Sequence, residues 1–484
     1  MFRRFGETAA LLVFLCGWPG VSGAEPPSAE SVAVDVRATR GSGIYHAGET
    51  ITFRIEVHGD AGDPVDKVEY SAKAFGTVVL ASGELALNDH SAEFQTSLAK
   101  PGALLIKVRG QTKSGREVAN LAGAVVDPSE IKPSMTEPAD FDSFWKAKLT
   151  SSAALPLNPQ IESVADNNEP AIDYAKVTLD NINHTHVYGQ VARPKAPGKY
   201  PAMLILQWAG VYALPRSNVI ARAKEGWLAM NISAHDGPFD LTESEFKRLG
   251  ETTLKDYVAI GETDRETSYF LRMFLGCQRA AEYLSQRADW DGRVLVATGT
   301  SQGGLQSIVT AALVPKISAI VISEPAGCDT TAQSAGRAFG WPYWQARATG
   351  PDAETIMRTS RYFDAVNFAR LVKCPALVGV GLKETTCPAA NVLAMTNTLA
   401  GPVEVLVLPN AGHQSTDKAR LARFQTRSAE WFTALKIGGF VLEPGRHFAC
   451  ETKTGTSRFP VIWNLLRGGW LIRLVQRESM ASFN

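Results

Sequence analysis

Hydrophobic and polar residues alternate along much of the first quarter of the chain. In the segment ITFRIEV, Phe53, Ile55 and Val57 alternate with polar residues, and a turn signal follows at 58–60. A period of two indicates strands with one buried face, and several such strands at short intervals are typical of a sandwich. We therefore expect residues 25–127 to form a small all-β domain of immunoglobulin-like type. Similar runs are VAVDV (32–36), TVVLA (77–81) and ALLIKV (103–108).

After a linker at 127–133 that contains two prolines, the pattern changes. Continuous apolar runs now alternate with long amphipathic stretches, such as 268–284 and 418–435. Apolar strands separated by helices are typical of a parallel sheet that is covered on both faces. Residues 128–436 are therefore predicted to form an α/β domain of the α/β-hydrolase type, with a doubly wound, mostly parallel sheet. Its apolar runs are AMLILQW (202–208), WLAMNI (227–232), RVLVAT (293–298), AIVIS (319–323), PALVGVG (375–381) and VEVLVL (403–408).

The two ends of the chain differ from both domains. Residues 1–24 combine a basic start, a short apolar core and small residues before Glu25, which predicts a secretory signal peptide. The apolar core is too short to span a bilayer, so we expect a secreted or periplasmic protein. Residues 437–484 fit neither domain, and Arg467 and Arg473 interrupt their apolar part, which argues against a membrane span. For this segment we expect a strip packed on the surface or a poorly ordered extension.

The composition supports this division and argues against some partners. A chain of 484 residues is too long for one ordinary core. Lys and Arg together number 49, as do Asp and Glu, so charge gives no reason to expect nucleic acid or an anionic membrane as a partner. The cysteines beyond residue 24 are odd in number and irregularly spaced, which predicts free buried thiols and neither a disulfide framework nor a zinc site. They are Cys277, Cys328, Cys374, Cys387 and Cys450.

The stretch VLVATGTSQGGLQSIVTAAL (294–313) contains the first candidate for chemistry. Gly299, Ser301 and Gly303 form a G-x-S-x-G pattern, which by itself is a weak signal. Here an apolar strand precedes the pattern and a helical pattern follows it, as at a nucleophile held on a sharp strand-to-helix turn. The turn is strained, so the residues two positions before and after the serine must be small. We therefore predict that Ser301 is a nucleophile.

A serine hydroxyl needs a base and an acid that orients the base. His413 follows the last apolar run of the sheet, where a hydrolase sheet places its catalytic histidine, whereas the alternative, His447, lies in the C-terminal segment. Glu384 follows the preceding apolar run and is the preferred acid, with Asp329 as its alternative one strand earlier. The order Ser301, Glu384, His413 is that of an α/β-hydrolase triad.

Two backbone N–H groups should stabilise an oxyanion beside the serine. One belongs to Gln302, at the start of the helix, and Ala209 is our first choice for the other, in the turn after the run AMLILQW. Aromatic residues around this pocket offer a platform for a sugar ring, although packing in a core or lid is the commoner role of such side chains. The candidates for substrate binding are Trp208, Tyr212 and Trp341, with Tyr343 and Trp344 as further members.

Several segments resemble carbohydrate esterase family 7, the family of acetyl xylan esterases and cephalosporin C deacetylases. They are FDSFW (141–145), GTSQGG (299–304), YFDAVN (362–367) and GLKETTCP (381–388), and the resemblance extends over residues 138–435. The Ser-Gln-Gly-Gly form and the Gly-Leu-x-acid-x-x-Cys-Pro form are fairly specific. The family has no β-sandwich in front of its hydrolase domain.

The resemblance implies a secreted serine esterase that removes acetyl groups from acetylated xylan or xylo-oligosaccharides. It places the family's triad at Ser301, His413 and Glu384, where the family has Asp at the last position. Two-step acyl transfer needs no metal or cofactor, and the family's usual hexamer suggests a homo-oligomer. The chain has Gln-Trp-Ala at 207–209 where the family has His-Gly-Tyr, and Ser-Ala-His-Asp-Gly at 233–237 where the family has Arg-Gly-Gln.

Two other functions stay open at this point. One is a general carboxylesterase or a peptidase on the same fold, because the triad serves all of these reactions. The other is a non-catalytic carbohydrate-binding protein with a degenerate hydrolase domain, because the sequence of the oxyanion turn is altered. Labelling by a fluorophosphonate separates the second from an enzyme, since only an activated serine reacts.

Overall fold

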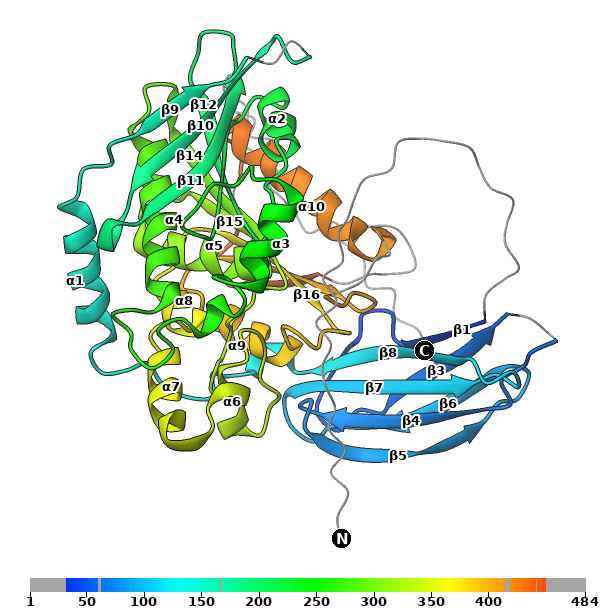
Figure 1. Cartoon of the computed structure of the whole chain (residues 1–484). Coiled ribbons are helices and arrows are strands. Elements are labelled where there is room, and N and C mark those ends of the chain that lie inside the picture. The colour runs from blue at the N-terminus through cyan, green and yellow to red at the C-terminus, as the bar shows by residue number, and fades with distance from the viewer. Residues whose placement is uncertain (1–31, 60–61, 166–167, 414–417, 441, 450–484) are drawn as a thin grey trace.

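Short strands form two sheets that pack face to face in the N-terminal domain (Figure 1). The structure is a computed structural model and describes residues 32–449 apart from 60–61, 166–167, 414–417 and 441. The predicted signal peptide, Cys450 and the rest of the C-terminal end lie outside the described residues. One sheet has the order β1 (Ala33–Ala38), β3 (Ile51–His58), β6 (Ser91–Thr96), and the other β2 (Ile44–Tyr45), β8 (Glu117–Val126), β7 (Gly102–Gln111), β4 (Lys67–Ala74), β5 (Val78–Ala86).

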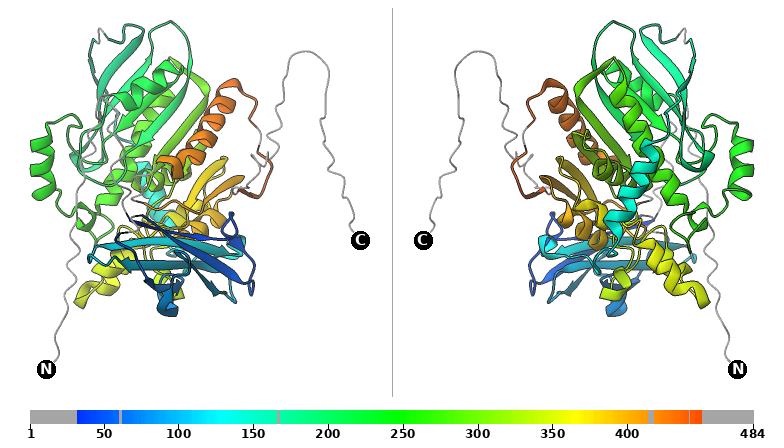
Figure 2. Two further views of the ribbon diagram at one scale, coloured as in Figure 1. Left: turned by 90° about the vertical axis from the view of Figure 1, so that its right-hand side faces the viewer. Right: turned by 90° about the vertical axis from the view of Figure 1, so that its left-hand side faces the viewer.

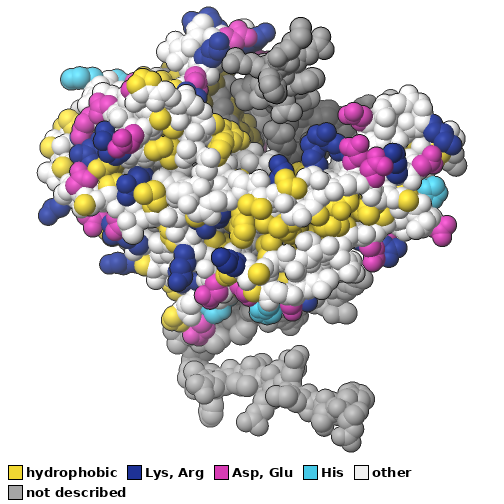
Figure 3. Space-filling view, turned by 90° about the horizontal axis from the view of Figure 1, so that it is seen from below, with side chains coloured by type: hydrophobic (Ala, Val, Ile, Leu, Met, Phe, Trp, Pro, Cys, Tyr) yellow, Lys and Arg dark blue, Asp and Glu magenta, His cyan; other side chains and the backbone are white. Residues whose placement is uncertain are grey.

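The alternation seen in the sequence places one side of each strand in the core of this domain. In β3, Ile51, Phe53, Ile55 and Val57 are buried while the residues between them face outward. The edge strand β5 is an exception, because Val78, Val79 and Leu80 are exposed. Figure 3 shows hydrophobic side chains gathered in a band on the face seen from below.

A second, larger sheet runs through the α/β domain. Its order is β18-β17-β16-β15-β14-β12-β13-β11-β10-β9. In this order the strands from β18 to β13 are parallel to one another. From β13 onward each strand is antiparallel to the one before it, in the pairs β13–β11, β11–β10 and β10–β9. The strands are β9 (Gln160–Ser163), β10 (Ile172–Asp180), β11 (His186–Pro194), β12 (Tyr200–Leu206), β13 (Leu228–Ile232), β14 (Trp290–Thr300), β15 (Ala319–Ser323), β16 (Ala376–Gly381), β17 (Val403–Leu408) and β18 (Arg446–Ala449).

Helices cover both faces of this sheet, as the continuous apolar runs predict (Figure 1). Leu295 and Ala297 of β14 pack on the side of α1, α4, α5, α8 and α9, while Val294 and Val296 pack on the side of α2 and α10. The helices are α1 (Phe141–Ala153), α2 (Ser217–Lys224), α3 (Glu243–Glu251), α4 (Tyr269–Gln286), α5 (Gln302–Leu313), α6 (Trp344–Arg347), α7 (Ala353–Ser360), α8 (Ala365–Ala369), α9 (Ala389–Thr398) and α10 (Lys418–Ile437). Short 3₁₀ turns are η1 (Pro128–Glu130), η2 (Ile182–His184), η3 (Tyr257–Ala259), η4 (Ala332–Ala335) and η5 (Gly350–Asp352).

Part of the C-terminal segment corrects the expectation that residues 437–484 fit neither domain. Residues Arg446–Ala449 form β18, which pairs in parallel with β17 and extends the hydrolase sheet at its edge. His447, the alternative base, stands on this strand opposite Glu404 and contacts the carbonyl oxygen of Glu443 through its Nε2 at 2.9 Å. The described helices include none that is long and apolar enough to cross a membrane.

The sandwich packs directly against the loop that follows β16. A Cβ atom on Gly123 of β8 would lie 1.9 Å from the carbonyl oxygen of Leu382, so only glycine fits there. Beside it, buried Lys383 reaches into the sandwich, and its Nζ lies 3.5 Å from the carbonyl oxygen of Val36 and 3.4 Å from Oδ1 of Asn120. Figure 2 shows the sandwich along one end of the α/β domain. The loop after β16 is therefore held by residues from both domains.

Replacing Gly123 by alanine tests this contact. Gly123→Ala forces the two backbones apart, and we expect a loss of about 1–3 kcal/mol in the free energy of unfolding, as for other overpacked sites. Gly237→Ala is the matched control, because a Cβ at Gly237 meets nothing within 4 Å. Thermal unfolding of both variants measures the effect, and equal melting temperatures for the two would contradict the predicted packing.

Candidate active site

Ser301 lies between the end of β14 and the start of α5, in a strained backbone conformation. Its φ is 57° and its ψ is −121°, a region that residues other than glycine rarely adopt. Two glycines make this turn possible. A Cβ on Gly299 would lie 2.5 Å from the carbonyl carbon of Gly303, and one on Gly303 would lie 2.3 Å from the carbonyl oxygen of Leu206. The turn thus presents Ser301 at the carboxyl edge of the sheet, at the N-terminus of a helix.

His413 and Glu384 meet at the same edge, each on the loop that follows its strand. His413 Nδ1 lies 3.2 Å from Oε2 of Glu384, and the side chain of Glu384 is 1% exposed. The two loops are tied together by backbone hydrogen bonds, because the N–H of Leu382 donates to the carbonyl oxygen of Leu408 and that of Lys383 to Ala411. A carboxylate at Nδ1 leaves Nε2 of the imidazole as the basic nitrogen.

The carboxylates around His413 favour its protonated form. Burial lowers the pKa of His413, but the hydrogen bond and charge of Glu384 oppose burial, Glu324 adds to their effect when it is ionised, and the pKa lies above the ordinary value of 6.5. His413 is therefore a stronger base than a solvated histidine. The protonated imidazole of His413 therefore persists to a higher pH than that of a solvated histidine.

Glu324 is the carboxylate that the sequence did not identify. It follows β15 directly, it is 3% exposed, and its Oε2 lies 3.9 Å from His413 Nδ1. Burial and the charge of Glu384 raise the pKa of Glu324 well above its ordinary value. A sequence signal existed, since an acidic residue at the carboxyl end of the strand next to the nucleophile strand points at the same edge. The turn 324–329 contains two carboxylates, Glu324 and Asp329, however, and the sequence pattern does not show which of them points toward the histidine.

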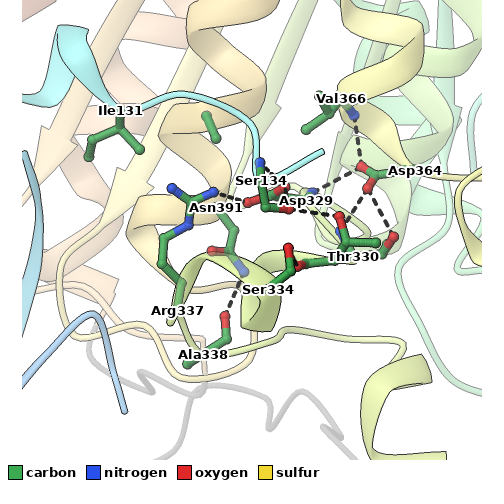
Figure 4. Close-up of polar contacts among 12 residues, drawn as sticks. Ile131, Ser134, Asp329, Thr330, Ser334, Arg337, Ala338, Asp364, Val366 and Asn391 are labelled. Carbon is green, nitrogen blue, oxygen red and sulfur yellow. Dashed lines mark hydrogen bonds and ion pairs between the residues drawn. The ribbon is translucent and has the colours of Figure 1, made fainter. Parts of the chain in front are cut away.

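Asp329, the alternative triad acid, belongs to a separate network (Figure 4). Its Oδ1 accepts hydrogen bonds from the N–H of Ser134 at 2.9 Å and the hydroxyl of Ser134 at 2.5 Å, and its Oδ2 forms a buried ion pair with Arg337. The backbone N–H of Asp329 donates to Asp364, which caps α8. Asp329 thus joins the segment at residue 134 to the turn after β15, whereas His413 contacts Glu384 and Glu324.

Cys387 completes the group of side chains around the histidine. Its backbone N–H donates to Oε2 of Glu384 at 2.9 Å, and its buried thiol lies near the side chain of Ser301. Burial and the charges of Glu384 and Glu324 are among the causes that raise the pKa of this thiol, so it is neutral. Among the described residues, Glu384, Cys387 and His413 are the group whose donor atoms lie close enough to hold a metal ion, within 4.8 Å of one another. Cys277, Cys328, Cys374 and Cys387 are all free.

The proposed oxyanion turn is held by buried polar side chains. Gln302 is the first residue of α5, so its backbone N–H has no hydrogen-bond acceptor within the helix. Its side chain accepts a hydrogen bond from the hydroxyl of Tyr257 at 3.0 Å, and that hydroxyl also accepts the N–H of Gly210 at 3.2 Å. Tyr257 therefore connects the turn that carries Ala209 to the start of α5. No pattern in the sequence points to Tyr257, which lies in the short 3₁₀ turn η3, distant in the chain from both residues that it connects.

The far side of this turn rests on His235 and two glutamine side chains. Nε2 of His235 lies 3.0 Å from the carbonyl oxygen of Gly210, and burial lowers the pKa of His235 to about 4. His235 is therefore neutral near pH 7 and donates to that carbonyl. The amide of Gln306 donates to the carbonyl oxygen of Gln207 at 2.7 Å, and the side chain of Gln207 accepts the N–H of Ala234 at 2.7 Å.

The aromatic candidates divide into rim and core residues. Trp208 is 58% exposed, and its ring centroid lies 5.7 Å from that of Tyr212, so the two form a pair next to Ala209. Trp341 is partly buried, and its backbone N–H donates to the carbonyl oxygen of Thr386, beside Cys387. Trp344 is 3% exposed and packs against Phe270, which is a core position.

Comparison with known proteins decides the family. The model of the acetyl xylan esterase family (AXE1) matches residues 126–432. The chain belongs to this family. It is 30% identical over 354 residues to an acetyl esterase, Axe7A, of Xylanibacter ruminicola, an alignment that covers 72% of the chain and 77% of that relative.

Solved structures agree with this assignment. An acetyl xylan esterase from Paenibacillus sp. R4 matches with a TM-score of 0.54 and 25% identity, over 62% of the chain and 98% of that structure. Acetyl xylan esterase 1 from Thermoanaerobacterium sp. JW/SL YS485 shares the fold with a TM-score of 0.54 and 18% identity, over 64% of the chain and 97% of that structure. This member of the acetyl xylan esterase family is thus a serine carboxylic-ester hydrolase with an α/β-hydrolase fold.

Removing the hydroxyl of Tyr257 tests its role in holding the oxyanion turn. In Tyr257→Phe both hydrogen bonds are lost, and we expect kcat for an acetyl ester to fall about tenfold with little change in KM, less than the 10²–10³ typical of a direct oxyanion donor. Tyr283→Phe is the matched control, because Tyr283 of α4 is also buried and its hydroxyl accepts a hydrogen bond from Arg287, which follows that helix. A loss of the same size in both variants would contradict the role of Tyr257.

The raised pKa of His413 predicts the pH dependence of ester hydrolysis. His413, the predicted base, must be neutral to accept a proton, so kcat/KM should fall on the acid side with a midpoint above pH 6.5. Initial rates of p-nitrophenyl acetate hydrolysis, measured after preincubation at each pH to exclude unfolding, give this midpoint. A midpoint at or below 6.5 would contradict the arrangement of the carboxylates around the imidazole.

Proposed function

We propose that this esterase removes acetyl groups from acetylated xylan or xylo-oligosaccharides by means of a triad of Ser301, His413 and Glu384. The observation that carries the proposal is the contact of 3.2 Å between His413 Nδ1 and Glu384 Oε2, at the sheet edge where the strained turn presents Ser301. Membership of the acetyl xylan esterase family supports the acetylated substrate. Relatives named as an acetyl esterase and as an acetyl xylan esterase support the short acyl group.

The mechanism is a two-step acyl transfer. Ser301 attacks the ester carbonyl while Nε2 of His413 takes its proton, and Glu384 holds the imidazole and stabilises the imidazolium. The backbone N–H groups of Gln302 and Ala209 stabilise the oxyanion, with the N-terminus of α5 behind them. His413 then protonates the leaving sugar alcohol, and in the second step it activates the water that releases acetate.

The aromatic residues beside Ala209 support a carbohydrate as the leaving group. Trp208 and Tyr212 form an adjacent aromatic pair of which Trp208 is largely exposed, and a sugar ring stacks on such a surface. Trp341 is tied through its backbone N–H to Thr386, beside Cys387. We propose that these three residues bind the sugar, that the predicted signal peptide directs secretion, and that the protein forms a homo-oligomer.

Acetate release tests the proposed function. The wild-type protein is incubated with acetylated xylan, acetylated xylo-oligosaccharides and cephalosporin C, and we expect acetate from the xylan substrates. Ser301→Ala should lose at least about 10³-fold in kcat because the nucleophile is gone. Ser285→Ala is the control, since Ser285 lies near the C-terminal end of α4 and donates to the carbonyl oxygen of Glu282.

Butyryl esters and a prolyl peptide, assayed beside these substrates, test the alternative functions. Faster hydrolysis of butyryl than of acetyl esters would indicate a general carboxylesterase, and cleavage of a prolyl peptide would indicate a peptidase. Full activity of Ser301→Ala would remove the triad from the mechanism. Labelling of the wild type by a fluorophosphonate, absent in Ser301→Ala, checks the nucleophile without a chosen substrate.

A further inference from the structure

Glu324 occupies a place that the fold keeps open for it. Its φ is 46°, in the left-handed region, and its N–H donates to the carbonyl oxygen of Gly379 at 2.9 Å. A Cβ on Gly381 would lie 2.6 Å from Oε1 of Glu324, so a side chain at Gly381 would displace the carboxyl group. A strained backbone and a missing side chain on the next strand thus combine to bring this carboxyl group to the edge where His413 lies.

The two carboxyl groups at His413 have few other partners. Oε2 of Glu384 lies 3.2 Å and Oε2 of Glu324 lies 3.9 Å from Nδ1 of the histidine. Oε1 of each glutamate is buried without a hydrogen-bond partner among the described residues. Two buried carboxylates beside one imidazole would repel each other at a high cost in free energy, and that cost falls when the two groups share one proton. A proton between the carboxyl groups also satisfies buried oxygen atoms that are otherwise unpaired.

The surroundings of Glu324 offer no second positive charge in the described part of the chain. The titratable groups that face it are Glu384 and His413, whose interactions raise and lower its pKa, and Cys387, whose thiol is neutral. Tyr343 faces Glu384, and burial and the Glu384 charge are among the causes that raise the pKa of its phenol. One imidazolium carries one positive charge, so it balances a carboxyl pair whose net charge is −1.

We propose that Glu324 is a second positioning residue for His413, which shares one proton with Glu384 and replaces Glu384 when that residue is lost. The proposal rests on the proposed triad. In the resting enzyme protonated Glu324 donates to the Glu384 carboxylate, which accepts the Nδ1–H of His413. When Nε2 takes the proton of Ser301, the pair keeps its one proton and its one negative charge, and that charge stabilises the imidazolium.

The replacement step follows from the same balance of charge. In Glu384→Gln the like-charged neighbour is gone, so Glu324 releases its proton to water at a lower pH. Its carboxylate then accepts the Nδ1–H of His413, 3.9 Å away in the wild type, after a small movement. The imidazole therefore keeps its proton on Nδ1, which is the tautomer that the reaction needs. The neutral amide of Gln at position 384 would not ensure this tautomer without Glu324.

A double-mutant cycle tests the proposal, with kcat/KM for p-nitrophenyl acetate as the readout. We expect about a 10-fold loss in Glu324→Gln and about a 10²-fold loss in Glu384→Gln. The double variant Glu324→Gln/Glu384→Gln should lose about 10⁴-fold, the size seen when a triad acid is replaced by an amide. The residual activity of Glu384→Gln should also fall at acid pH as Glu324 becomes protonated. Equal activities of Glu384→Gln and the double variant would overturn the proposal.

Further measurements separate this proposal from the proposed function and from misfolding. Thermal unfolding of each variant shows whether it is folded at the assay temperature, and a variant unfolded there is measured at a lower one. A wild type without activity on any acetyl ester, or an active Ser301→Ala, would remove the proposed function. An active wild type with an inactive Ser301→Ala and no difference between Glu384→Gln and the double variant would remove the role of Glu324 alone.

Discussion

A carboxylate withdrawn from water is the constraint on which the rest of this site depends. The side chain of Glu384 is 1% exposed, and burial of an isolated carboxylate costs several kcal/mol unless hydrogen bonds and an opposite charge offset it. The N–H of Cys387 and the imidazole of His413 supply these partners, and Nδ1 of His413 lies within ion-pair distance of the carboxylate, at 3.2 Å. The acid loop and the histidine loop are therefore tied through Leu382 and Lys383, because a shift of either loop would leave the charge unpaired.

A domain that lies outside the matched esterase segment helps to hold the acid loop in place. The family model begins at residue 126, yet Gly123 of the sandwich packs on the carbonyl group of Leu382, and Val36 and Asn120 receive Lys383. These contacts fix the loop two residues before Glu384. The sandwich thus packs against the acid loop in this chain, so the geometry of His413 and Glu384 depends on both domains.

The sequence predicts what depends on neighbouring residues and misses what depends on distant ones. The alternation in β3 and the apolar runs of the parallel strands predict those elements, and the glycines around Ser301 predict its turn, since each requirement is local. The sequence analysis does not predict the antiparallel pair β10–β11, because hydrophobic and polar residues alternate only weakly there. It does not predict β18 either, because pairing with β17 defines that strand. Glu324 and Tyr257 escape for the same reason: their roles come from side-chain directions and from partners far along the chain, which no periodicity encodes.

The altered oxyanion turn illustrates how a site can change in sequence and keep its support. At 207–209 the family's His-Gly-Tyr is replaced by Gln-Trp-Ala, but the turn is fixed from behind by Gln207, Gln306 and Tyr257, all buried. These amides and this hydroxyl bind backbone groups, so they hold the turn whatever side chain stands at its tip. Trp208 at the tip is exposed and takes no part in that support through its ring. The side chain at position 208 is therefore free to vary, while the backbone of the turn stays in place.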